Sequence, residues 1–131
     1  KFGIKKFKTF TTFASKIFKI KKNVEKNIND LKKKYKNIIG YGAPAKATTA
    51  LNFFNLDNKD IDYIIEDNPL KNKKLIPGVN IPIKKKDEVK VKSSLILVLA
   101  WNFFKEIKKN NMNLANNFIS IKSLGKKNEI N

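Results

Sequence analysis

The stretch IIGYGAPAKATTALNFF, residues 38 to 54, is where this chain changes character. A lysine-rich segment with apolar residues at helical spacing precedes it, and no glycine occurs between Gly3 and Gly40. Two isoleucines then run into two glycines and a proline, after which a helical pattern begins. A strand that ends on a glycine loop and continues as a helix is typical of α/β proteins that hold an anionic ligand at that loop.

Gly40, Gly42 and Ala45 fit the spacing G-x-G-x-x-G/A between a strand and a helix. In dinucleotide-binding folds the first position makes a tight turn, the second admits a pyrophosphate, and the third packs helix on strand. The helix dipole and its free amides favour an anion there. Pro44 removes one amide donor, and Lys46 offers a charge that compensates in part. The alternative is that the glycines serve only to make a tight turn.

Other polar side chains stand where a ligand of this loop would reach them. Thr48 lies in the first helical turn, where its hydroxyl is available as a donor. Glu66 and Asp67 end the next predicted strand at the distance expected for a ribose contact, and Asn68 follows them. Asn102 comes directly after a buried apolar run, so it either caps the next helix or faces a ligand at the sheet edge.

The composition excludes several kinds of site. The 131 residues suffice for one domain, and they include no cysteine and no histidine. Disulfides, zinc–thiolate sites, thiol nucleophiles and a histidine base are therefore excluded, and we predict no metal site and no catalytic residue. The longest apolar run, near residues 95–101, is far shorter than the ~20 residues that span a bilayer. No secretory signal is visible, so we expect a cytoplasmic protein.

The formal net charge of +18 is weak support for a nucleic-acid role. All 29 basic residues are lysine, and Asn and Ile are abundant, which looks like the coding bias of an AT-rich genome. Selection for phosphate recognition would be expected to retain arginine, whose planar fork binds phosphate in two-pronged fashion. We therefore predict neither nucleic acid nor membrane as a partner.

Residues 1–36 are predicted to be an extended entry, residues 1–8, followed by a long amphipathic helix. Apolar residues recur there in alternating steps of three and four, with lysines on the other faces. We expect this face to pack on its own domain or on a neighbouring one, because Asn and Glu share the polar face and Trp is missing from the apolar face of a membrane-surface helix. The apolar positions are Phe10, Phe13, Ile17, Ile20, Val24, Ile28, Leu31 and Tyr35.

Residues 37–131 alternate short apolar runs with helical stretches, which predicts an α/β, Rossmann-like three-layer fold with a mainly parallel sheet. Between residues 68 and 83 four proline and glycine residues predict an irregular connection with at most a short edge strand near 79–83. The polar residues 122–131 are expected to fray. Strands are predicted at 37–41, 60–65, 94–101 and 117–121, and helices at 45–55 and 103–110.

Four segments together resemble one family: GYGAPAK at 40–46, DNP at 67–69, the K-x-x-x-x-x-PG-x-x-IPI pattern at 71–83, and LAWNFFKEI at 99–107. In order and spacing they are similar to the carboxyl-terminal domain of S-adenosylmethionine-dependent sugar C-methyltransferases, over about residues 9–121. This chain departs from the family at Ala47 and Thr48, where the family commonly has Gly-Asn, and also within residues 71–80, so the sugar is left open.

The resemblance implies that this Rossmann-like domain closes over a nucleotide-linked keto-deoxysugar. A central methyl-donor domain of the same polypeptide would bind S-adenosylmethionine and supply the histidine base, so this chain alone would be inactive. Removal of a proton beside the sugar keto group would give an enolate that attacks the sulfonium methyl. The resemblance also implies Gly42, Ala43, Ala45 and Lys46 near the anionic part of the substrate, and Asn102 near its sugar or nucleotide.

Two other functions are also compatible with the sequence. One is a stand-alone NAD-type dinucleotide-binding module, against which stand Pro44 and the absence of a catalytic histidine or a Tyr-x-x-x-Lys pair. The other is a basic protein whose long helix binds a polyanion.

Overall fold

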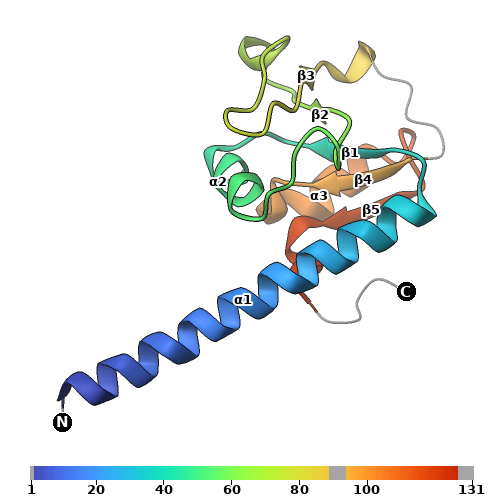
Figure 1. Cartoon of the computed structure of the whole chain (residues 1–131). Coiled ribbons are helices and arrows are strands. Elements are labelled where there is room, and N and C mark those ends of the chain that lie inside the picture. Colours follow the sequence, from blue (N-terminus) through green and yellow to red (C-terminus); the bar gives the residue numbers. More distant parts are fainter. Residues whose placement is uncertain (1, 89–93, 127–131) are drawn as a thin grey trace.

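The structure is a computed structural model that describes residues 2–88 and 94–126, and its centre is a five-stranded sheet (Figure 1). The strands lie in the order β3-β2-β1-β4-β5, and all four pairings are parallel, as predicted. Parallel strands require crossover connections, and the chain supplies them as helices and irregular segments. The strands are β1 (Ile38–Tyr41), β2 (Ile64–Ile65), β3 (Ile83–Lys84), β4 (Leu95–Val98) and β5 (Asn117–Ser120).

Helices cover both faces of the sheet, which gives the three layers of a Rossmann-like α/β fold. Buried residues of α1 (Phe2–Lys34) and α2 (Ala45–Phe53) form one core with the Ile38 face of β1. On the opposite face, Ile39 and Tyr41 of β1 belong to a second core against which α3 (Phe104–Asn110) packs. Because β1 and β4 are buried along their whole length, they read as continuous apolar runs.

The predicted extended entry is wrong, because α1 is already helical from Phe2. Phe7 stands one helical step before Phe10, so the apolar period extends further back than the predicted start at Thr9. No proline interrupts these residues, and Gly3 lies in the first turn, where a poor helix former is best tolerated. No helix within residues 2–88 and 94–126, the 33-residue α1 included, combines the length and apolar character needed to cross a membrane.

The second half of α1 packs on the domain, and residues 121–126 hydrogen-bond to it through Asn27. Val24, Ile28 and Leu31 are buried. The amide Nδ2 of Asn27, itself buried, donates to the carbonyls of Leu124 and Lys126 at 2.9 and 3.0 Å. The frayed tail predicted from residue 122 is therefore wrong as far as residue 126, because 3-10 turns at Ile121–Gly125 bury Leu124 completely; residues 127–131 lie outside the described part.

Four predicted elements are shorter or displaced, and the first is the strand predicted at 94–101, which ends at Val98 because 3-10 turns begin at Trp101. Residues 58–60 form a turn, and the Ile61 N–H bonds to the Asp57 carbonyl, so β2 is reduced to Ile64–Ile65. The edge strand predicted at 79–83 begins only at Ile83, because Gly78 and Asn80 adopt positive φ. The helix predicted to reach Asn55 ends at Phe53 for the same reason, since Asn55 has φ 55°.

Asn27→Ala is expected to lower the free energy of unfolding by about 1–3 kcal/mol, because the carbonyl oxygens of Leu124 and Lys126 lose their hydrogen-bond donor. Urea denaturation monitored by circular dichroism measures this change. The control is Asn29→Ala, at an exposed position of the same helix, which should change stability by under about 0.5 kcal/mol. An equal loss of stability for both variants would show that the Asn27 hydrogen bonds to residues 124 and 126 do not stabilise the fold.

Candidate functional site

A cleft of ≈ 590 Å³ opens at the carboxyl ends of β1 and β2, facing the turn after β4. β1 lies between β2 and β4. The chain continues from β1 to β2 and β3 on one side of it, and then crosses to β4 and β5 on the other side. In open parallel sheets, ligands bind at the point where the strand order reverses in this way. The cleft therefore lies where this fold places a ligand.

The predicted site residues gather around this cleft and a neighbouring hollow. Gly42, Ala43, Pro44 and Asn68 line the cleft. The hollow, of ≈ 340 Å³, shares Pro44 with the cleft, and its predicted residues are Ala45, Lys46 and Asn102. Thr48 lines neither space, and its carbonyl accepts a hydrogen bond from the Asn52 side chain at 2.9 Å.

The two glycines of the loop have different roles. Gly42 has φ +86°, and a Cβ there would stand 2.8 Å from the Cβ of Ala100, in the turn after β4. Gly40 lies within β1, where a Cβ would stand 2.8 Å from Cγ1 of Ile64 on the adjacent strand. Gly42 therefore makes the turn, and Gly40 allows side chains of the neighbouring strands to pack over β1.

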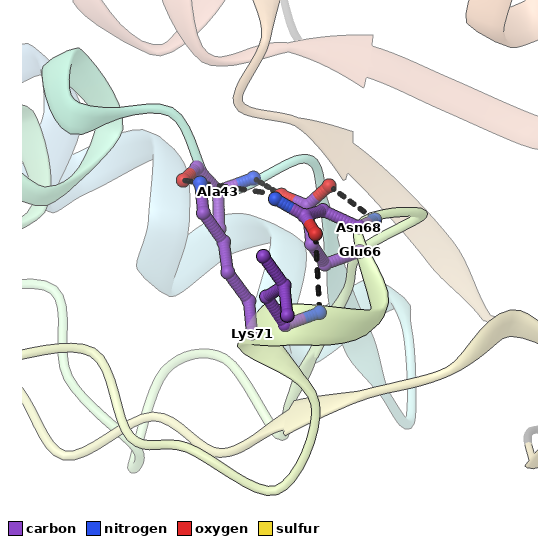
Figure 2. A network of polar contacts seen from close by, with 5 residues as sticks. Ala43, Glu66, Asn68 and Lys71 are labelled. Atoms are coloured by element: carbon purple, nitrogen blue, oxygen red, sulfur yellow. Dashed lines mark hydrogen bonds and ion pairs between the residues drawn. The ribbon is translucent and has the colours of Figure 1, made fainter.

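Protein groups already occupy part of the glycine loop (Figure 2). The N–H of Ala43 donates to Oε2 of Glu66 at 2.7 Å, and the N–H of Gly42 donates to the carbonyl of Ile65. Nζ of Lys71 donates to the Ala43 carbonyl at 2.6 Å and lies 3.9 Å from the same Glu66 oxygen. The other carboxylate oxygen of Glu66 accepts from the N–H of Asn68 at 3.1 Å. Glu66 thus stands where the predicted cradle would place an anion.

The first two residues of α2, Ala45 and Lys46, line the hollow and carry the remaining backbone donors. Intrahelical bonding begins with the Ala47 N–H, which reaches the Pro44 carbonyl at 2.9 Å. The N–H groups of Ala45 and Lys46 precede it, so they have no acceptor within the helix. Both residues are exposed. An anion is therefore better accommodated beside Ala45 and Lys46 than against Ala43.

The cleft itself is acidic, in contrast to the chain as a whole. Three carboxylates line it, from Glu66, Asp67 and Glu106, with Lys71 and Lys86 as the basic residues. Carboxylates accept hydrogen bonds from hydroxyl groups and repel phosphate. The arrangement suits a polar, hydroxyl-bearing ligand in the cleft, with any phosphate outside it.

The Tyr41 phenol forms part of the cleft lining. Its ring is buried in the second core, and its O–H reaches the two Asp67 oxygens at 3.1 and 3.0 Å. Oδ1 of Asn111 lies 3.5 Å from the same hydroxyl. Burial above all, and then the hydrogen bond to Asp67, raises the pKa of Tyr41 to about 12. The phenol is therefore neutral near pH 7 and orients the Asp67 carboxylate.

Several residues of the cleft were not among the predicted ones, although the sequence held signals for three of them. Tyr41 stands between the two glycines, and Lys71 opens the pattern at 71–83 that carries part of the family resemblance. Glu106 and Asn111 come from α3 and the residue after it, and only the folded chain brings them to the cleft. Glu106 also lies within the segment LAWNFFKEI at 99–107, whereas no local motif indicates Asn111.

Asp67→Asn is expected to lower the pKa of Tyr41 below about 12 while leaving it above the ordinary value of 10.0, because burial remains when the charge is removed. Ultraviolet difference titration of the tyrosines measures this. Tyr63→Phe, made in both backgrounds, removes the signal of the other tyrosine whose pKa is raised. An unchanged Tyr41 titration in Asp67→Asn would contradict the contact.

This chain is similar to known C-methyltransferases. The family of C-methyltransferase C-terminal domains matches over residues 1–120. C-methyltransferase NovU of Streptomyces niveus is 28% identical over 106 residues, which make up 80% of this chain and 25% of that protein. The chain thus spans about a quarter of the length of this relative. With the family match over most of its length, the chain belongs to the C-methyltransferase C-terminal domain family.

Proposed function

We propose that this chain is the substrate-binding C-terminal domain of an S-adenosylmethionine-dependent C-methyltransferase that acts on a nucleotide-linked keto-deoxysugar. The full-length protein is then a cytoplasmic methyltransferase, and this chain alone is inactive. The division into a connecting segment, residues 1–36, and a Rossmann-like domain, residues 37–131, belongs to the same proposal. Family membership supports the methyltransferase class, and the similarity to NovU supports C-methylation.

The observation that carries the proposal is the convergence of the predicted residues at one edge of the sheet. Seven of the eight, all but Thr48, line the cleft or the hollow that share Pro44. They come from three separate connections, which follow β1, β2 and β4. A ligand that bridges the two spaces would touch all three connections at once.

The charges divide such a ligand between the two spaces. The diphosphate lies beside Lys46 and the first amides of α2, where a cation and free donors are available. The sugar lies in the cleft, where the carboxylates of Glu66 and Asp67 accept from its hydroxyls. Asn102, in the hollow, contributes an amide to the nucleotide or the sugar.

The methyl donor belongs elsewhere in the full-length protein in this proposal. The glycine loop of this chain has its Ala43 N–H occupied by Glu66 and has a proline at position 44, so it fits an adenosyl cofactor poorly. S-adenosylmethionine would supply the methyl group from a separate domain of the same polypeptide. The described residues then hold and orient the sugar.

Lys46→Ala is expected to weaken binding of a thymidine diphosphate sugar by roughly ten- to hundredfold, the value of a charge-assisted hydrogen bond. Isothermal titration calorimetry at moderate salt measures the Kd. The control is Lys59→Ala, an exposed lysine in the turn after α2, which removes the same charge away from the hollow. Equal effects of the two variants would show that only net charge matters.

Parallel titrations with NAD and duplex DNA test the competing functions. Binding of NAD alone, unaffected by Lys46→Ala, would refute the sugar proposal in favour of a dinucleotide module. A polyanion-binding protein would instead bind DNA with an affinity that falls steeply as salt rises. The proposal requires the nucleotide sugar to bind more tightly than either.

The 131-residue chain is expected to give no binding heat with S-adenosylmethionine, because the proposed methyl-donor site lies outside it. Calorimetry at micromolar protein concentration measures this, and the thymidine diphosphate sugar serves as the positive control for the same preparation. A clear micromolar affinity for S-adenosylmethionine would refute the proposed division of labour.

A further inference from the structure

The first half of α1 projects beyond the domain (Figure 1), and apolar side chains on it are exposed. Phe10 and Phe13 are 70% and 61% exposed, whereas Val24, further along the helix, is 1% exposed. We call Phe10, Phe13, Ile17 and Ile20 the N-terminal apolar face of α1. It is unusual for a folded chain to leave aromatic side chains in water at regular spacing, and such surfaces mark sites of association.

This face continues the stripe that packs on the sheet. Ile20 is followed by Val24, Ile28 and Leu31 at steps of four, four and three, so the exposed and the buried residues lie on one side of the helix. Ile20 also lines a mainly apolar hollow of ≈ 320 Å³ with Trp101. A partner that covers the face would therefore sit beside this domain and contact it as well as the helix.

The charge around the face indicates what kind of partner fits. Between Phe2 and Val24 the helix carries seven lysines and no carboxylate. A second copy of the chain would bring the same lysines to the contact, and like charges oppose it. A partner with an apolar groove rimmed by carboxylates is complementary.

We infer that the N-terminal apolar face of α1 docks against the remainder of the C-methyltransferase polypeptide, which fixes this domain beside the methyl-donor domain. The inference rests on the proposed function. The family is defined as a C-terminal domain, and the chain spans only a quarter of its relative NovU, so most of such an enzyme lies outside the match. Covering the face would bury two phenylalanines at the centre of a contact, where aromatic anchors dominate affinity.

Hydroxyl-radical footprinting with mass spectrometry tests the contact on the full-length protein encoded by the same reading frame. Modification of Phe10 and Phe13 should fall roughly tenfold relative to the 131-residue chain, as expected for side chains that enter an interface core. Phe18 is the matched control, because it is 60% exposed on the same stretch of helix but off the stripe, with Lys22 over its ring. Its modification should stay unchanged.

A charge substitution provides a second measurement. Phe10→Glu with Phe13→Glu should lower the Tm of the full-length protein by several degrees and leave the Tm of the 131-residue chain unchanged, because neither side chain is buried in the chain alone. Phe18→Glu should change neither Tm.

Four results would overturn the inference. The first is equal labelling of Phe10 in the full-length protein and in the 131-residue chain, and the second is protection of Phe18 equal to that of Phe10. The third is protection of Phe10 that grows with the concentration of the 131-residue chain alone. The fourth is protection of Phe10 that appears only on phosphatidylglycerol vesicles. A reading frame without a further domain would overturn it as well. Nucleotide-sugar binding by the 131-residue chain is measured separately, so failure of docking and failure of the proposed substrate are distinguishable.

Discussion

The close approach of the loop after β1 to the turn after β4 is the constraint on which the site depends. At Gly42 the backbone takes φ +86°, and the space that a Cβ would occupy lies 2.8 Å from the Ala100 side chain. Any other residue would both strain the turn and separate the two connections. Because β1 is central and pairs with β2 as well as β4, the same turn brings the β2 connection within hydrogen-bond reach.

This closeness explains why a glycine loop does not by itself make an anion site. Glu66 ends up beside Ala43 because β1 and β2 are adjacent and in register, with Tyr41 opposite Ile65. The carboxylate then satisfies the Ala43 amide, and Lys71 bridges from the other side. Both backbone polar groups of Ala43 are thus bonded to side chains of the chain itself. A phosphate at this amide would have to displace the Glu66 carboxylate, which is already hydrogen-bonded.

Much of the fold could be predicted from local sequence, whereas much of the site's chemistry could not. The buried runs at Ile38–Tyr41 and Leu95–Val98, together with the helical pattern after Pro44, gave the parallel sheet and its layers. The glycine spacing also located the cleft. The hydrogen bond from the Ala43 amide to Glu66 could not be predicted, because it depends on which strands pair. The turns at Asn55 and at Asn80 could not be predicted either, because each depends on a positive φ that an asparagine can adopt but does not require.

The opposed charges of the two spaces limit what this domain can hold. A chain with net charge +18 has placed three carboxylates in its main cleft, and one of them, Asp67, is held by a phenol that stays neutral near pH 7. General attraction of polyanions would not need such a cleft and would be weakened by it. A ligand with hydroxyl groups at one end and phosphate at the other resolves the contradiction, since each end then meets complementary groups. The cleft and Lys46 therefore favour a ligand of mixed polarity over a simple polyanion.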